Sequence, residues 1–424
     1  MPNADSLCSD TDAASGPHLV DSTMFWSRQG DAVRRYLLAK REGLQRAGWR
    51  HSIVAPADEF DIDEIDDLYN CGGVPLPASG GLRLPFRRNA ARRLIEQQAP
   101  DLIEVGDPYR LAWAGLDAAQ RLGVPAVAFC HRNVASLAAR LGGATRARQS
   151  WSRRIAGAYL RRVYGQFDLV LAPSDALARE LRELGLARVQ RQSFGVDHAL
   201  FHPARRDDGW RAALGVPATT RLLLYAGRFS ADKNLPLLAD VVRRLGPRYL
   251  LVAAGAGPVP PLGPQVQLLP PVDQPLELAR LLASADCFVH AGERETSGLG
   301  ALEAMACGTP VVVRAAGGLA EVVDGGAGLA VRSEHIDEWA EAITALFAAG
   351  RESWSTTVRA RAADHAWEAV LPALLRRYQR LLDGGRSSAL TTTSNRFSFG
   401  EVTQPAVLWR PSVPMAAPGK DATA

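Results

Sequence analysis

Two glutamates, Glu295 and Glu303, stand eight positions apart in the stretch ERETSGLGALEAMACGTPVVV. A polar turn that contains Gly298 lies between them and leads into a segment of alanine, leucine and methionine, which predicts the start of a short helix. The backbone N–H groups at a helix N-terminus attract an anion, and glycine allows a ligand to approach the backbone closely. A phosphate would not tolerate two carboxylates in contact with it. We therefore expect each acid to bind another part of the ligand.

Two cations lie in one turn further upstream. Arg228 and Lys233 are five positions apart in RFSADKN, directly after the apolar run LLLYAG, and Lys233 is one of only three lysines in the chain. The carboxyl ends of parallel strands meet at one edge of a sheet, where open α/β proteins bind their ligands. The two cations, the glycine turn AGAGP and the Thr296–Leu299 turn with its unpaired amides should therefore converge there, which predicts a diphosphate site.

The two acids then have distinct expected roles. Glu303 lies about one turn into the helix, so it can reach past the phosphates and accept hydrogen bonds from a diol such as ribose. Glu295 precedes the helix and can accept from hydroxyls at the other end of the diphosphate. A ligand with sugar, diphosphate and ribose in series fits this order, and such a ligand is a nucleotide sugar.

The elements that position these residues alternate between short apolar strands and amphipathic helices, which favours an α/β fold with parallel doubly wound sheets. Two such series occur, so we expect two Rossmann-like lobes, with a long amphipathic helix that closes the fold at the C-terminal end. Neither GxxxxGK[ST] nor an opening GxGxxG is present. The expected parts are a disordered tail (1–17), an acceptor-side lobe (18–203), a nucleotide-sugar lobe (204–365), a closing helix (366–383) and a second disordered tail (384–424).

Composition limits the alternatives. The chain has 424 residues, of which 47% are hydrophobic, and a net charge of +4. No apolar run reaches the roughly 20 residues that span a membrane, and the N-terminus does not resemble a secretory signal. Five scattered cysteines without a CxxC or Cys/His cluster predict neither a disulfide framework nor a metal site. We expect a cytoplasmic protein without a metal or other cofactor.

These motifs together resemble the retaining glycosyltransferases of family 4, which have the GT-B fold. The resemblance implies two Rossmann-like, doubly wound lobes facing across a cleft. The paired glutamates followed by ALEAMACGTPVVV resemble that family's signature, and YAGRFSADKN resembles its Arg/Lys turn. AGAGP, GGLAEVVDGGAGL and SFGVDHALFHP match further family positions in order. The resemblance covers residues 18 to 383, and the signature is specific when the Arg/Lys turn lies upstream of it.

The resemblance implies a role for each matching residue. Arg228 and Lys233 would bind the donor diphosphate and stabilise the leaving nucleotide, and Glu295 would contact the transferred sugar. His131, which follows VPAVAFC, would lie near that sugar. The remaining donor-binding residues would be the amides of Gly298 and Leu299, the side chain of Ser297, and Glu303 on ribose. Retention in this family is written as front-face substitution without a metal.

Two departures from the family pattern stand out. Relatives often carry Gly-Gly in the first-lobe loop, whereas here Gly30 is followed by Asp31 in SRQGDAVRRY. Asp31 adds a negative charge on the acceptor side, close to where phosphate is expected. Ser297 occupies a position where many relatives have an aromatic residue, which predicts a reshaped sugar pocket.

The leading interpretation is a retaining glycosyltransferase that moves a hexose, with mannose favoured, from a nucleotide sugar to a glycan or lipid-linked acceptor. GDP-mannose is the favoured donor because the whole-chain pattern most resembles bacterial α-mannosyltransferases, and UDP-glucose or UDP-GlcNAc is the alternative. A non-catalytic nucleotide-sugar-binding protein is the alternative from another class, suggested by the altered Gly-Gly loop. An epimerase would need an acid/base cluster that the sequence lacks.

Other features have two readings. His290 and Cys307 are expected to pack in the core, and Asp107 and Tyr109 either line the acceptor cleft or cap a helix. The Arg-rich stretches GLRLPFRRNAARR and RARQSWSRRIAGAYLRRVYG form a solvated basic face or a surface for anionic lipid, because tryptophan and aliphatic residues interleave with arginine. No nucleic-acid-binding motif accompanies the charge, so nucleic acid is not an expected partner.

Overall fold

We analysed a computed structural model of the chain. It describes residues 16–27, 32–58, 62, 64–76, 82–85, 87–131, 146–217 and 219–384. The expected tails therefore lie outside the described residues, apart from Gly16, Pro17 and Gly384. The carbonyl of Pro17 accepts a hydrogen bond from the amide of Arg50, so this residue is tied to the first sheet.

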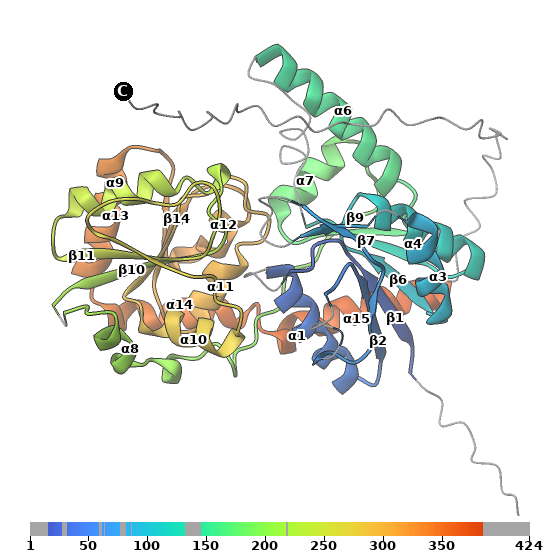
Figure 1. The fold of residues 1–424 in the computed structure, drawn as a ribbon, viewed down its shortest axis with the longest axis horizontal. Coiled ribbons are helices and arrows are strands. Elements are labelled where there is room, and N and C mark those ends of the chain that lie inside the picture. Colours follow the sequence, from blue (N-terminus) through green and yellow to red (C-terminus); the bar gives the residue numbers. More distant parts are fainter. Residues whose placement is uncertain are drawn as a thin grey trace, which may run out of the picture. The chain divides into compact units, whose positions relative to one another are not determined.

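The first lobe is built on a seven-stranded parallel sheet in the order β3-β2-β1-β6-β7-β8-β9. Its strands are β1 (His18–Ser22), β2 (Arg50–Ala55), β3 (Leu68–Asn70), β6 (Leu102–Val105), β7 (Ala126–Phe129), β8 (Leu169–Ala172) and β9 (Val189–Arg191). Its helices are α1 (Ala32–Arg46), α3 (Arg88–Gln97), α4 (Arg110–Leu122), α6 (Arg146–Tyr164) and α7 (Asp175–Glu183). A small antiparallel ribbon pairs β4 (Val74–Pro75) with β5 (Arg83–Leu84). Figure 1 shows these elements from blue to green.

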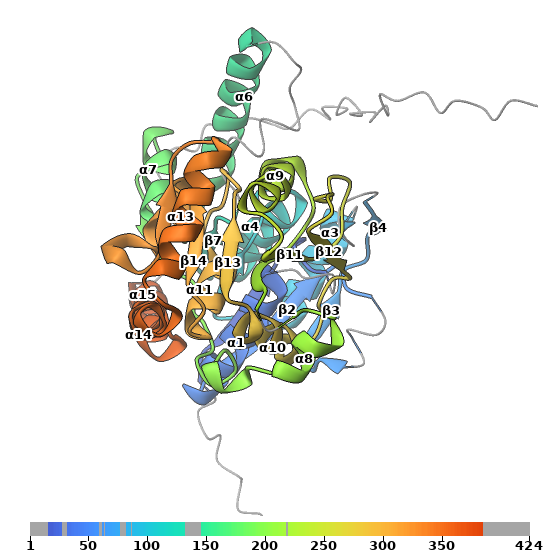
Figure 2. The ribbon, with the colours of Figure 1, turned by 90° about the vertical axis from the view of Figure 1, so that its left-hand side faces the viewer.

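The second lobe has a six-stranded parallel sheet in the order β12-β11-β10-β13-β14-β15. Its strands are β10 (Arg221–Ala226), β11 (Tyr249–Ala254), β12 (Val266–Leu269), β13 (Cys287–His290), β14 (Val311–Arg314) and β15 (Leu329–Val331). The helices are α8 (Asp208–Ala213), α9 (Leu235–Leu245), α10 (Pro275–Ser284), α11 (Leu299–Ala306), α12 (Gly317–Val322), α13 (Ile336–Ala348) and α14 (Arg351–Ala363). In Figures 1 and 2, α9 and α13 lie on one face of this sheet and α10, α11 and α14 on the other.

Helices on both faces explain the composition of the central strands. Strands β6, β7 and β13 and the middle of β10 are buried. Their sequences are therefore mostly apolar rather than alternating, apart from Glu104 in β6 and His290 at the end of β13. Each sheet changes its winding direction once, between β1 and β6 in the first lobe and between β10 and β13 in the second. The expected α/β fold with two parallel, Rossmann-like sheets is confirmed.

The chain returns to the first lobe at its C-terminal end. The last helix, α15 (Trp367–Gly384), follows a bridge between Val196 and Ala366. The guanidinium of Arg377 in this helix donates to the side chains of Gln190 and Gln192 near β9. Among the described helices, none is both long enough and apolar enough to cross a membrane.

Candidate functional site

The site forms where the second sheet changes its winding direction. The turn after β10 carries Arg228 and Lys233, and the segment after the neighbouring strand β13 carries Glu295. A crevice outside the carboxyl ends of such strands is the usual ligand site of a doubly wound sheet. Residues about 65 positions apart in sequence therefore converge, as the order of strands requires.

Glycines allow the turns of the site to pack backbone against backbone. A Cβ at Gly255 would lie 1.9 Å from the carbonyl oxygen of Gly227, so only glycine fits where the turn after β11 meets the turn after β10. Gly298, immediately before α11, has a left-handed backbone with φ of 65°, which favours glycine. The amide of Gly318 donates to the carbonyl of Glu295 at 2.9 Å. These contacts fix the backbone around the charged side chains.

Lys233 and Glu295 form the central ion pair. The Lys233 ammonium contacts Glu295 Oε1 and lies 3.6 Å from Asp232 Oδ2. Burial would raise the pKa of Glu295, but the Lys233 charge and His290 hold that pKa well below its usual range. Glu295 is therefore a carboxylate at neutral pH and can only accept hydrogen bonds.

His290, the last residue of β13, also faces Glu295. Its Nδ1 accepts a hydrogen bond from the Gly292 amide at 3.1 Å, so its Nε2 carries the proton. That Nε2 lies 3.4 Å from Glu295 Oε1. His290 is buried and packs against Tyr225 and Phe288 as expected, and its ring in addition lines the cavity described below. Its position at the end of a strand was the signal in the sequence.

Glu303 is paired with an arginine from the first lobe. Arg35 Nε donates to Glu303 Oε1 at 3.0 Å, and Arg35 Nη2 donates to Glu303 Oε2 at 2.9 Å. The Glu303 side chain is only 3% exposed and that of Arg35 15%. Sequence reasoning missed Arg35, because no local pattern distinguishes it from the many other arginines of the chain.

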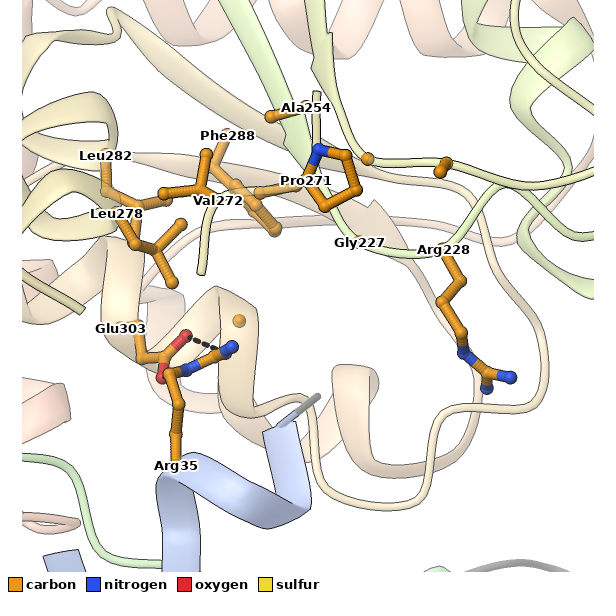
Figure 3. Close-up of a pocket in the computed structure, with 14 residues that line it drawn as sticks. Arg35, Gly227, Arg228, Ala254, Pro271, Val272, Leu278, Leu282, Phe288 and Glu303 are labelled. Carbon is orange, nitrogen blue, oxygen red and sulfur yellow. Dashed lines mark hydrogen bonds and ion pairs between the residues drawn. The ribbon is translucent and has the colours of Figure 1, made fainter. Parts of the chain in front are cut away.

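Two adjoining cavities surround these residues. The first has an apolar wall and, opposite that wall, the Arg35–Glu303 pair (Figure 3). Figure 3 shows the side chain of Arg228 pointing away from Glu303 on the far side of this cavity. The apolar wall consists of Pro271, Val272, Leu278, Leu282 and Phe288.

The second cavity has a volume of about 190 Å³ and is lined by both polar and apolar side chains. Lys233, His290 and Glu295 line it together with first-lobe residues that include His131. Arg35 and Arg228 line both cavities. The structure thus puts Glu303 on one cavity and Glu295 on the other, with cations between them.

His131 reaches the second cavity from the end of β7. Its ring stacks on Phe129 with 4.9 Å between centroids, and its carbonyl accepts a hydrogen bond from Thr296 Oγ1 at 3.0 Å. This bond ties His131 to the segment that carries Glu295. The structure therefore brings these two predicted residues together around one cavity.

The hydrogen bonding at the start of α11 differs from the expectation. The amide of Leu299 donates to Ser297 Oγ at 3.3 Å. The prediction that this amide is unpaired was therefore wrong. The hydroxyl satisfies this amide locally, as serine does at helix starts. Gly30 and Asp31, predicted on the acceptor side, lie outside the described residues.

Asp107 has a structural role in the part of the chain that the structure describes. Its carboxylate accepts from the amides of Met24 and Tyr109, both at 2.8 Å, and is fully buried. Burial raises its pKa to about 6 despite these two bonds. Asp107 thus joins the loop after β1 to Tyr109, the residue before α4. Within the described ranges, no group of three or more His, Cys, Asp or Glu side chains could hold a metal ion.

Solved structures with the same architecture show the fold. Sucrose-phosphate synthase from Thermosynechococcus elongatus is 21% identical, covers 87% of this chain and 100% of its own, and has a TM-score of 0.68. HepE from Anabaena, solved with UDP and glucose, is 18% identical over 86% of this chain and 99% of its own, with a TM-score of 0.66. The two sheets thus have the GT-B fold of glycosyltransferases.

Sequence comparisons identify the family. The model for Glycosyltransferase Family 4 matches residues 33–200, and the model for Glycosyl transferases group 1 matches residues 207–361. A GDP-mannose-dependent alpha-mannosyltransferase from Mycolicibacterium smegmatis is 28% identical over 84% of this chain and 95% of its own length. A GDP-mannose-dependent alpha-(1-6)-phosphatidylinositol dimannoside mannosyltransferase from Mycobacterium tuberculosis is 30% identical over 71% of this chain and 79% of its own length. The chain belongs to glycosyltransferase family 4 and is an enzyme that transfers a hexose from a nucleotide sugar to an acceptor.

Proposed function

We propose that this glycosyltransferase moves mannose from GDP-mannose, with retention of configuration, to a glycan or lipid-linked acceptor. The observation that carries the proposal is the pair of adjoining cavities, one with an apolar wall and Glu303, the other with Lys233 and Glu295. The apolar wall and Glu303 of the first cavity suit the base and ribose of a nucleoside. The polar groups of the second cavity suit the hydroxyls of a sugar. The relatives whose names specify GDP-mannose support this choice of base and sugar.

The donor would lie along the two cavities in the order base, ribose, diphosphate and sugar. The base would cover the apolar wall near Phe288, and the ribose hydroxyls would donate to Glu303. Arg228 and Lys233 would bind the diphosphate. The backbone of Gly298 and Leu299 and the hydroxyl of Ser297 would complete this part of the site.

The mannose would then lie in the second cavity, beside Glu295 and His131. In the retaining reaction, the bond between sugar C1 and the diphosphate oxygen breaks. The acceptor oxygen attacks the same face, and its proton passes to the leaving phosphate. The protein contributes mainly orientation and stabilisation of the negative charge on the leaving group. Gly30 and Asp31 belong to the acceptor side in this proposal.

A donor comparison tests the proposal. The purified enzyme is incubated with GDP-mannose, UDP-glucose or UDP-GlcNAc, and release of nucleoside diphosphate is followed with and without glycan and lipid-linked acceptors. We expect acceptor-stimulated release of GDP and attachment of α-linked mannose. Turnover of a UDP-sugar alone would overturn the donor assignment and favour the UDP-sugar alternative. No release from any donor would favour the non-catalytic alternative.

We further propose that α6 contacts anionic lipid, which would place the enzyme at the inner face of the cell membrane. Trp151 is 63% exposed and Ile155 40%, and both share the outer face of this helix with exposed arginines. In Figure 1, α6 is the long green helix at the edge of the first lobe. An aromatic and an aliphatic side chain among cations suit a negatively charged membrane interface.

Vesicle flotation tests the lipid contact. Binding should require phosphatidylglycerol in phosphatidylcholine vesicles and fall several-fold in Trp151→Ser, while Leu262→Ser, which changes an exposed apolar residue of the second lobe, should leave it unchanged. Equal binding to neutral vesicles, or no effect of Trp151→Ser, would contradict it.

A further inference from the structure

Arg35 occupies the junction between the two cavities although it comes from the first lobe. It lines both cavities, and its guanidinium holds both oxygens of Glu303 at 3.0 and 2.9 Å. Those two oxygens are the ones that a ribose diol would use. Arg35 and a bound ribose therefore compete for the same acceptors.

The second acid shows the same arrangement. Glu295 is held by Lys233, which is a proposed ligand of the diphosphate. Each of the two acids is thus paired with a cation that lies where a phosphate is expected. Seven charged side chains line the two cavities: the cations are Arg35, Arg228, Lys233 and Arg294, and the carboxylates are Asp232, Glu295 and Glu303.

This balance favours a role for Arg35 in binding phosphate. The seven side chains sum to one positive charge, and removal of Arg35 brings the sum to zero. A diphosphate ester brings about two negative charges into this partly buried space, where uncompensated charge is costly. Arginine has five N–H donors in a planar fork that suits phosphate as well as carboxylate, so the guanidinium can bind phosphate oxygens when it leaves Glu303.

We propose that Arg35 is a donor-binding residue that the first lobe supplies to the second-lobe site. In this exchange, the guanidinium of Arg35 moves from Glu303 to the diphosphate, and the ribose hydroxyls take its place on Glu303. Lys233 exchanges Glu295 for phosphate in the same way, and the sugar hydroxyls take its place. The inference rests on the proposed function, because it requires a nucleoside diphosphate in these cavities.

Calorimetry with GDP and guanosine tests the exchange. In Arg35→Ala the affinity for GDP should fall about 10- to 100-fold, the range for a lost hydrogen bond to a charged group. The affinity for guanosine, which has no phosphate, should stay equal or rise, since Glu303 loses a competitor. Arg46→Ala is the matched control, because Arg46 lies at the exposed end of the same helix and pairs only with Glu42 in the described structure. It should bind both ligands as the wild type does.

Two further variants separate phosphate binding from an indirect effect. Arg35→Lys keeps a positive charge beside Glu303 and should lose less GDP affinity than Arg35→Ala, and thermal melting confirms that each variant is folded. In the Glu303→Gln background, Arg35→Ala should still weaken GDP binding, because the lost contact is to phosphate. If the effect of Arg35→Ala disappears in that background, Arg35 acts only through Glu303 and the proposal is wrong.

The remaining outcomes distinguish this inference from the proposed function. The role of Arg35 is overturned if Arg35→Ala binds GDP as tightly as the wild type or more tightly, or if its affinity for guanosine falls as much as its affinity for GDP. If Lys233→Ala still loses GDP affinity in that case, only the role of Arg35 fails and the proposed function stands. If the wild type binds UDP and not GDP, the donor assignment fails and the same comparison is made with UDP and uridine. If it binds neither diphosphate, both proposals fail.

Discussion

Each lobe pairs a lysine with carboxylates, but the two clusters have opposite surroundings. In the first lobe, Lys40 is fully buried and donates to Asp21 on β1 at 2.9 Å and to Glu104 on β6 at 2.7 Å. His51 and the hydroxyl of Tyr378 complete that cluster. In the second lobe, Lys233 and Glu295 keep 12% and 21% of their side-chain surface exposed and line a cavity.

The difference separates a structural cluster from a functional one. The groups around Lys40 come from β1, β2, β6 and α15, so they join the C-terminal helix to the first sheet. Neither cavity at the site is lined by them. The groups around Lys233 come from two adjacent strand ends, and a ligand can replace either partner. Access for a ligand, rather than the ion pair itself, therefore indicates a binding role.

The largest expected effect is on stability. Lys40→Met leaves Asp21 and Glu104 buried without their cation, which should lower the free energy of unfolding by about 3–5 kcal/mol. Urea denaturation measures this, and the folded fraction should still bind GDP. A loss below about 1 kcal/mol would mean that the buried cluster does not hold the first lobe together.

The matching change in the second lobe should act on turnover instead. Lys233→Met should reduce the rate about 100-fold, the usual cost of one contact to a developing negative charge. The free energy of unfolding should change less than in Lys40→Met, because Glu295 lines a cavity. Arg228→Ala should behave alike, and Arg243→Ala, an exposed cation on α9, serves as control. Wild-type turnover in Lys233→Met would remove the distinction between the clusters.

A pH-dependent effect should be confined to the first-lobe cluster. Burial raises the pKa of Glu104 to about 7 although Lys40 opposes the shift, and Asp21 raises it further. The folded protein then holds this proton more tightly than the unfolded chain, so the contribution is complete below about pH 4.5 and is lost as the pH rises through 7. Burial lowers the pKa of His51, so the contribution of His51 to stability changes with pH in the opposite direction. It does so both in the wild type and in the variant Glu104→Gln. Urea denaturation at about pH 5 and 7.5 should therefore show that the free energy of unfolding of the wild type falls relative to that of Glu104→Gln, which has no carboxyl proton to lose, as the pH rises. A constant difference would refute the shift.

The smallest expected effect is that of a chelator. We predict that EDTA leaves turnover unchanged, because cations of the protein are proposed to neutralise the diphosphate. Steady-state rates with EDTA, and with added magnesium or manganese, measure this. Loss of activity in EDTA and its recovery with a divalent ion would show that Arg228 and Lys233 do not suffice.

The two clusters also differ in how far they could be predicted. Lys233 and Glu295 each lie in a segment that leads from a strand to a helix, and the two strands, β10 and β13, are neighbours in the parallel sheet. Their convergence therefore follows from the order of the strands. The alternation of strands and helices likewise predicted both sheets correctly. Local patterns of this kind depend on backbone geometry, which a short stretch of sequence determines.

Long-range partners carry no such local signal. Arg35 meets Glu303 across 268 positions, and many other arginines in this chain could satisfy the same carboxylate. The partners of Lys40 come from elements up to 338 positions away, between Lys40 and Tyr378. Their identity depends on how α1 and α15 pack on the first sheet, and the sequence pattern shows only that both helices are amphipathic.

Calorimetry of GDP binding to Glu303→Gln and Glu295→Gln tests the central claim that the two acids serve opposite ends of the donor. Glu303→Gln should weaken GDP binding by roughly 10- to 100-fold, because the ribose loses a charged acceptor. Glu295→Gln should leave GDP affinity equal or slightly higher, since Lys233 is released, yet lower turnover sharply. Equal losses of GDP affinity in both variants, or no loss in either, would contradict this account.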